Sequence, residues 1–176
     1  MKDVMIDFET LSTEANAVVA AIGAAWFDRK TGQVGKTLEM RVHLPAYLND
    51  QRFHLDPNTI LWWLQQERQA IQLTFFTGDT WMPDAAFQNL NDFVKGSERI
   101  WCHATFDFPI LQYSLKTFGI KPNFKYTSCR DLRTLVDEAG YDYRNHPRQH
   151  VHHRALGDVL HQIDYAMACF RINGDL

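Results

Sequence analysis

Long apolar runs, paired cysteines and a surplus of one charge are all absent from this sequence. The longest apolar run covers residues 17–27 and has 11 residues, whereas a membrane-spanning helix needs about 20. The N-terminus lacks the basic segment, apolar stretch and cleavage site of a secretory signal. On these grounds we expect no membrane span and a cytoplasmic protein.

Cysteine is scarce and dispersed. Cys102, Cys129 and Cys169 are odd in number and far apart, and no CxxC motif occurs, which excludes a disulfide framework and a zinc knuckle. Charge is also nearly balanced, with 18 Lys+Arg against 21 Asp+Glu. Binding a polyanion by non-specific neutralisation usually requires a strongly basic chain, so such a partner would have to be held locally or through metal ions.

The composition is that of an ordinary globular domain. The 176 residues, 45% hydrophobic and 22% charged, are enough for one full hydrophobic core. No repeat, low-complexity tract or linker interrupts the chain. We therefore expect a single domain over residues 1–176.

Hydrophobic periodicity predicts an α/β fold. Strands with period-two alternation are predicted over residues 4–10 and 37–44, and a mostly buried strand is predicted over residues 18–28. Their short connections predict an antiparallel start. Helices and strands then alternate. The helices are predicted from Asp56–Pro57 onward and over residues 83–94, 105–118 and 155–170, and the strands over residues 100–103 and 126–129. Together these elements predict a mixed five-stranded sheet flanked by helices.

Asp7 and Glu9 are the most informative pair of acids. Two residues apart on a strand, their side chains leave the same face, about 6.5–7 Å apart at the backbone. A shared divalent cation would relieve the repulsion between them. The alternative is a solvated strand face without a metal.

Two further acids lie near the starts of predicted helices. Asp107 lies in the first turn of a helix whose expected N-cap is Thr105, where the helix dipole alone would explain an acid. Asp158 points away from the apolar stripe of the last helix, so by itself it is expected to be exposed. His153 could share a site with Asp158 only if it lies in a loop before that helix, because five residues on a continuous helix place them about 140° apart.

Read in order, these segments resemble a known family. The chain carries D-x-E at Asp7 and Glu9, F-D at Phe106 and Asp107, and H-x-A-x-x-D from His153 to Asp158. This order and spacing resemble the DEDDh 3′–5′ exonucleases of the ribonuclease-H-like fold, over nearly the whole chain. Residues 56–63 and 130–135 resemble the compact branch with bacterial exoribonucleases and a phage exodeoxyribonuclease.

The resemblance implies a mechanism and a set of site residues. Asp7, Glu9, Asp107 and Asp158 would bind two Mg²⁺ or Mn²⁺ ions, which hard oxygen ligands suit. His153 would be the general base that removes a proton from the attacking water. The products would be 5′ mononucleotides released from single-stranded 3′ ends. The sequence leaves open the choice between RNA and DNA and whether a homodimer forms.

The substrate contacts are expected next to the first motif. The resemblance implies that Thr10 contacts the terminal nucleotide, that Leu11 wedges against its base and that Phe106 lines the same pocket. Core packing is the alternative for Leu11 and Phe106. Trp62 is a candidate for stacking on a base. It diverges from its helical neighbour Trp63 by about 100°, so the two cannot anchor the core in the same direction, and burial of both against different neighbours is expected.

Two positions depart from the family pattern. His103 stands where relatives often have a small or Asn-like residue, and Gly157 stands where a second acid is frequent. Neither departure removes an expected metal ligand.

The sequence also offers three other patterns or functions. Residues 32–37 look like a phosphate-binding loop, but Lys30 replaces the first glycine that this motif requires and the setting is a hairpin. His146, His150, His152 and His153 could indicate zinc, yet no sulfur ligand is near and the exonuclease pattern accounts for His153. The alternative function is a non-catalytic nucleic-acid-binding module on the same fold.

Overall fold

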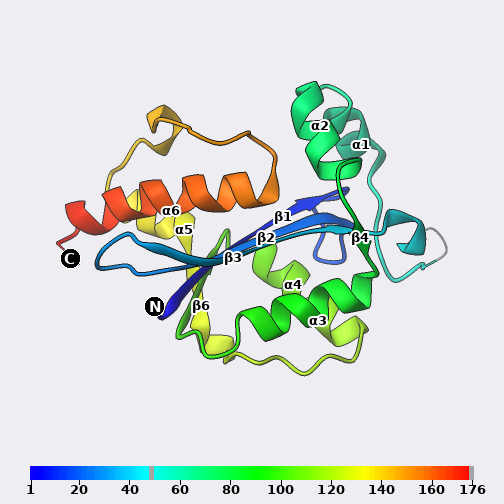
Figure 1. Cartoon of the computed structure of the whole chain (residues 1–176), viewed down its shortest axis with the longest axis horizontal. Helices are drawn as coiled ribbons and strands as arrows, with labels where there is room; N and C mark the ends of the chain where they lie inside the picture. Colours follow the sequence, from blue (N-terminus) through cyan, green and yellow to red (C-terminus); the bar gives the residue numbers. More distant parts are fainter. Residues whose placement is uncertain (48–49, 175–176) are drawn as a thin grey trace.

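The protein is a mixed β-sheet with helices packed on both faces (Figure 1). A computed structural model describes residues 1–47 and 50–174. The strands are β1 (Asp3–Thr10), β2 (Val19–Phe27), β3 (Val34–Val42), β4 (Thr80–Trp81), β5 (Arg99–Cys102) and β6 (Cys129–Asp131). The α-helices are α1 (Pro57–Trp63), α2 (Arg68–Phe75), α3 (Pro83–Phe93), α4 (Asp107–Thr117), α5 (Leu132–Glu138) and α6 (Ala155–Ile172). Three short 3₁₀ helices are η1 (Leu44–Tyr47), η2 (Tyr126–Ser128) and η3 (Tyr143–Asn145).

The sheet has the order β4-β3-β2-β1-β5-β6, with β1 in its interior. β1 pairs with β2 antiparallel and with β5 parallel, and β2 pairs with β3 antiparallel. This confirms the α/β fold and the antiparallel start. It corrects the strand count from five to six, because β4 has only two residues and shows no alternation that a sequence pattern could reveal.

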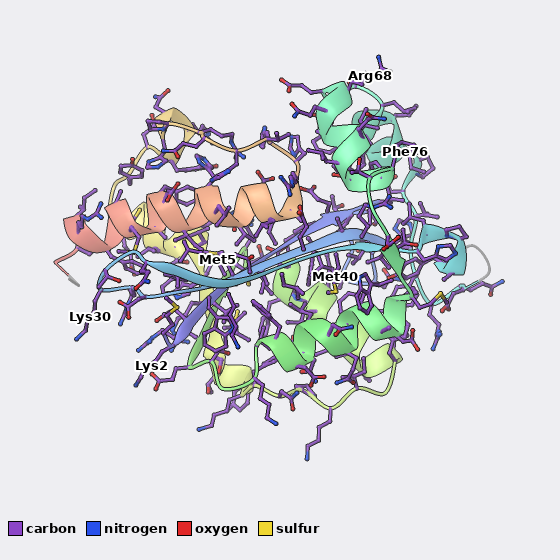
Figure 2. The ribbon with its side chains drawn as sticks, viewed as in Figure 1. Lys2, Met5, Lys30, Met40, Arg68 and Phe76 are labelled. Atoms are coloured by element: carbon purple, nitrogen blue, oxygen red, sulfur yellow. The ribbon has the colours of Figure 1, made fainter. Side chains whose placement is uncertain are left out.

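Two hydrophobic cores lie on the two faces of the sheet. α5 and α6 cover one face, and α3 and α4 cover the other (Figure 1). Figure 2 shows Met5 on the α6 side of the sheet and Met40 on the α3 side. Both faces of β1 are therefore buried, which is why acids on this strand cannot be solvated as they would be on a wet sheet face.

Several boundaries differ from those that the periodicity predicts. The fifth predicted strand, over residues 126–129, is instead the 3₁₀ helix η2 followed by β6. The N-cap of α4 is Phe106 rather than Thr105, because the chain first makes a turn at residues 104–106. No sequence pattern predicts α2 and α5, which are only about two turns long and, unlike the equally short α1, have no Asp–Pro start.

The topology agrees with the rejection of a phosphate-binding loop at residues 32–37. Residues 32–37 form the turn between β2 and β3 and the first part of β3, so they do not join a strand to a helix. No helix in the described part of the chain is long and apolar enough to cross a membrane.

Candidate active site

β1 delivers Asp7 and Glu9 to the face of the sheet that α6 covers. Their register partners on β2 are Gly23 and Ala21, whose small size leaves space above the strand. Asp7 is 8% exposed and Glu9 is 6% exposed. The acids predicted from the alternation therefore share a face, and that face is buried.

Gly23 brings the start of α6 directly onto the sheet. A Cβ atom at this position would lie 2.4 Å from the backbone carbonyl of Ala155, so only glycine permits this approach. The first turn of α6 then places Asp158 beside Asp7 and Glu9. Asp158 is only 9% exposed, so the expectation of exposure from its helical position was wrong, because the face opposite the apolar stripe packs over the acids of β1.

Asp107 is held in place by backbone groups of two strand ends. Its Oδ1 accepts a hydrogen bond from the amide of Phe8 (3.2 Å), and its Oδ2 accepts one from the amide of His103 (2.9 Å). The side chain is fully buried. The carboxylate therefore lies at the junction of β1 and β5, next to Asp7.

Asp7 is the point where two groups of potential metal ligands meet. Ligand atoms of Asp7, Glu9 and Asp158 lie within 4.8 Å of one another, and so do those of Asp7, His103 and Asp107. The structure thus brings together the four acids that the sequence motifs single out, from three segments far apart in the chain.

The acids strongly perturb one another. Burial raises the pKa of Asp7 well above its usual range, and the charges of Asp107, Glu9 and Asp158 raise it further. Burial and the same neighbouring charges also raise the pKa of Glu9. Burial raises the pKa of Asp107 to about 7. Such a cluster favours a bound cation, because positive charge in the site stabilises the ionised form of each carboxylate.

The donor set fits a hard divalent cation. It consists of carboxylate oxygens, and Oε1 of Glu9 is buried without a hydrogen-bond partner among the described residues. An ion at that oxygen would satisfy it. The residues able to hold it are Asp7, Glu9, Asp107 and Asp158.

Two polar side chains that no sequence motif indicated also contact these acids. Gln162 donates a hydrogen bond from Nε2 to Oδ1 of Asp7 (2.7 Å), and Arg148 forms an ion pair with Asp158. Gln162 could have been found from its position one helical turn after Asp158 on α6. Arg148 lies in an irregular segment, where no periodicity reveals its direction.

His153 lies in the turn before α6, as a shared site with Asp158 requires. Its backbone is left-handed (φ 58°). Its amide donates a hydrogen bond to Oδ2 of Asp158 (3.1 Å), and its carbonyl accepts one from the hydroxyl of Thr74 (2.8 Å). Burial and the charge of the adjacent His152 lower the pKa of His153, so the ring is neutral and able to accept a proton at pH 7.

A cavity of about 400 Å³ opens beside Glu9. Thr10, Phe106 and Trp62 line it, whereas Leu11 packs against the hydrophobic core and is not part of the lining. The predicted contacts Thr10, Phe106 and Trp62 therefore share one cavity, and the wedge role of Leu11 stays a prediction.

The two neighbouring tryptophans differ in exposure. Trp63 is buried, and its Nε1 donates a hydrogen bond to the carbonyl of Thr10 (2.8 Å). Trp62 is 41% exposed and contacts the ring of His153 edge-on, with centroids 4.8 Å apart. The expectation that both are buried against different neighbours is wrong for Trp62, because its side of α1 faces His153 and the cavity beside Glu9 rather than a covering element.

The structure also explains the two departures from the family pattern. A Cβ atom at Gly157 would lie 2.7 Å from the carbonyl of Val151, so the preceding segment packs directly on the first turn of α6. His103 lies against Asp107 with Nδ1 3.8 Å from Oδ2, and burial lowers its pKa to about 4. At neutral pH His103 is therefore an uncharged neighbour of the acids.

Comparison with solved structures shows which fold this is. Escherichia coli exonuclease I in complex with a dA16 oligonucleotide is similar with a TM-score of 0.71 and 15% identity, over 98% of this chain and 41% of that chain. Exonuclease X in complex with 5′ overhanging duplex DNA has a TM-score of 0.60 and 15% identity, over 98% of this chain and 93% of that chain. This chain thus spans about two fifths of exonuclease I. The fold is that of the ribonuclease-H-like exonucleases.

Sequence comparison then shows the family. Residues 2–170 match the family described as the 3′-5′ exoribonuclease Rv2179c-like domain. The exodeoxyribonuclease of Enterobacteria phage T4 is 24% identical over 163 residues, which covers 78% of this chain and 71% of that protein. The chain belongs to the Rv2179c-like family of 3′–5′ exonucleases, which confirms the resemblance seen in its motifs.

Proposed function

We propose that this chain hydrolyses the terminal phosphodiester bond at the 3′ end of single-stranded RNA or DNA and releases 5′ mononucleotides. Asp7, Glu9, Asp107 and Asp158 hold two Mg²⁺ or Mn²⁺ ions, and His153 is the general base. The observation that supports this most directly is the buried cluster of four acids around Asp7. A protein that only binds nucleic acid gains nothing from four acids that repel one another.

The bound ions would supply positive charge beside both the attacking and the leaving oxygen of the phosphodiester. The chain's own residues provide the remaining functions. His153 accepts the proton of the attacking water. The hydrogen bond from its backbone amide to Oδ2 of Asp158 holds this residue next to the acids.

The terminal nucleotide binds in the cavity beside Glu9. Trp62 offers an exposed aromatic face, and base–aromatic stacking is tolerant of sequence. Thr10 is fixed on the cavity wall by the hydrogen bond from Trp63. The two structural relatives named above were solved with DNA, which supports a nucleic-acid strand as the ligand here.

The test is digestion of a 5′-labelled single-stranded oligonucleotide in Mn²⁺ or in EDTA. We expect a ladder that shortens from the 3′ end in Mn²⁺ and is absent in EDTA. Asp158→Asn should abolish the ladder, and Asp164→Asn, an exposed acid on the same helix, is the matched control that should retain it.

The same assay separates the alternatives. Binding without shortening in Mn²⁺ and in Mg²⁺ would contradict hydrolysis and support the non-catalytic module. Matched RNA and DNA oligonucleotides, each single- and double-stranded, would show the preferred substrate, because recognition of the 2′-hydroxyl distinguishes RNA from DNA.

A further inference from the structure

His152, His153 and Asp158 form a third group of potential metal ligands, which is the one of the three groups with two histidines. Their ligand atoms lie within 4.8 Å of one another. The two imidazole rings stack with centroids 3.7 Å apart and planes 21° apart. The group contains two nitrogen donors and one oxygen donor, whereas Asp7, Glu9 and Asp158 contain only oxygen.

One half of this group is held rigidly by the fold. The left-handed turn at His153 is fixed through its amide by Asp158 and through its carbonyl by Thr74. Trp62 and Trp63 contact the ring of His153 edge-on from the side of α1. His153 and Asp158 are therefore in place before any ligand binds.

The other half is adjustable and accessible. His152 is exposed and makes no side-chain hydrogen bond among the described residues, so its ring can rotate at low cost. Arg148, which pairs with Oδ1 of Asp158, has a long side chain that is 29% exposed and can move into solvent. An incoming cation can thus gain both a nitrogen from His152 and an oxygen from Asp158.

Two imidazoles and one carboxylate are the ligand set of many open zinc sites, with a fourth position for water. Tetrahedral bonds of about 2.0–2.1 Å place ligand atoms about 3.4 Å apart, so the group must contract slightly, which rotation of His152 permits. Mg²⁺ prefers oxygen ligands and selects the carboxylate cluster instead. The two neighbouring groups therefore differ in metal preference.

We propose that His152, His153 and Asp158 form a site for Zn²⁺ that shares Asp158 with the carboxylate cluster, and that Zn²⁺ bound there inhibits hydrolysis. The inhibitory half rests on the proposed function, because the ion would occupy the nitrogen of His153 that accepts the proton and an oxygen of Asp158. The binding half is independent of that function.

Zinc binding is tested on the full chain by competition with a chromophoric chelator. The variant His152→Ala removes one ligand, and His150→Ala is the control from the same segment, outside the ligand group. We expect His152→Ala to weaken zinc binding by more than the roughly 10–100-fold cost of losing an outer-shell partner, and His150→Ala to bind like the unmodified chain. Bound Co²⁺ should show the visible absorption of a tetrahedral site in the unmodified chain and lose it in His152→Ala.

Inhibition is tested with saturating Mg²⁺ and micromolar Zn²⁺. The unmodified chain and His150→Ala should be inhibited, and His152→Ala should resist zinc when its rate is compared with its own rate in the absence of zinc. Equal binding and equal inhibition in His152→Ala would overturn the proposal and place zinc at the carboxylates, and zinc binding without inhibition would overturn the inhibitory half. If no variant hydrolyses substrate in Mg²⁺ alone, the proposed function fails while the chelator and Co²⁺ results still decide the binding half.

Discussion

His153 is the residue on which the proposed chemistry depends most directly. Its ring lies between the exposed Trp62 and the acids, and its backbone is fixed by the carboxylate of Asp158. The ring itself is the functional part, because the fixing contacts involve backbone atoms that any side chain retains. Chemistry and positioning can therefore be separated by substitution.

His153→Ala should reduce turnover by about 10²–10⁴-fold, the usual contribution of a general base. The affinity of the carboxylates for Mn²⁺ should stay within a few-fold of that of the unmodified chain, since the hydrogen bond from the backbone amide of residue 153 to Asp158 does not require the ring. Single-turnover kinetics and calorimetric titration with Mn²⁺ measure the two effects. Near-normal turnover would exclude His153 as the base.

Arg148 competes with a divalent cation for Asp158. Its guanidinium pairs with Oδ1 of Asp158, and its charge also lowers the pKa of Glu9. Arg148→Ala should therefore tighten Mn²⁺ binding by about two- to fivefold, in line with the ~1 kcal/mol upper range of a part-exposed ion pair.

Arg148→Lys is the matched variant for this test, because it keeps the positive charge and should bind Mn²⁺ with nearly unchanged affinity. Calorimetry on the three proteins gives the comparison. Weaker Mn²⁺ binding in Arg148→Ala would mean that the arginine assists the ion rather than competes with it.

At the scale of elements, the site depends on how closely α6 approaches β2. The contact between Gly23 and the backbone of Ala155 sets this distance, and Asp158 follows one turn later. The helix cannot tilt away without separating Asp158 from Asp7. The geometry of the acids is thus a property of helix-on-sheet packing rather than of any one loop.

Gly23→Ala should destabilise the fold by about 1–3 kcal/mol, the usual cost of overpacking, and should lower activity further by moving Asp158. Gly35→Ala is the matched control on the neighbouring strand, because its Cβ would clash with the far end of the flexible Met1 side chain and would otherwise make an ordinary contact with Cβ of Trp26 (3.6 Å). Chemical unfolding and Mn²⁺-dependent hydrolysis give the two readouts. Equal behaviour of the two variants would show that the approach at Gly23 does not set the site.

At the scale of the whole molecule, the buried acidic cluster makes the stability of the fold depend on pH. The chain's net charge of −3 is modest, yet burial raises the pKa of Asp7, Glu9 and Asp107. A carboxyl group with a raised folded-state pKa favours the fold at low pH and costs stability as pH rises through that pKa. For Asp107 the window runs from about 4, the usual value, to about 7.

Asp7→Asn should therefore raise Tm in EDTA by about 2–8 °C at pH 8, which corresponds to roughly 1–2 kcal/mol at this chain length, and by less at pH 5. The quantity to follow is the difference in Tm between the variant and the unmodified chain. The pKa values of His103 and His153 are lowered in the fold, so these histidines destabilise both proteins as pH falls, and the difference cancels their effect. Scanning calorimetry at both pH values measures it. Asp164→Asn should show no such difference, and destabilisation of Asp7→Asn at pH 8 would contradict the repulsion argument.

Much of the fold and of the acid set could be predicted from local patterns. Alternation placed Asp7 and Glu9 on one face, and the motif order linked them to Asp107, His153 and Asp158. The two-residue strand β4 is too short to alternate, and the helices α2 and α5 lack the Asp–Pro start from which the equally short α1 was predicted. Boundaries near residues 105 and 126 were wrong, since turns and 3₁₀ helices there depend on neighbouring strands.

The sequence by itself determined the family, the α/β class and the identity of the acids, because these depend on residue type and on spacing within short segments. Only the tertiary structure decided that Asp158 is buried, that Trp62 is exposed, and that Arg148, Gln162 and His152 join the site. Each of these facts arises from contacts between segments distant in the chain, above all the approach of α6 to β2 at Gly23. Such contacts are set by packing in three dimensions, which local periodicity does not encode.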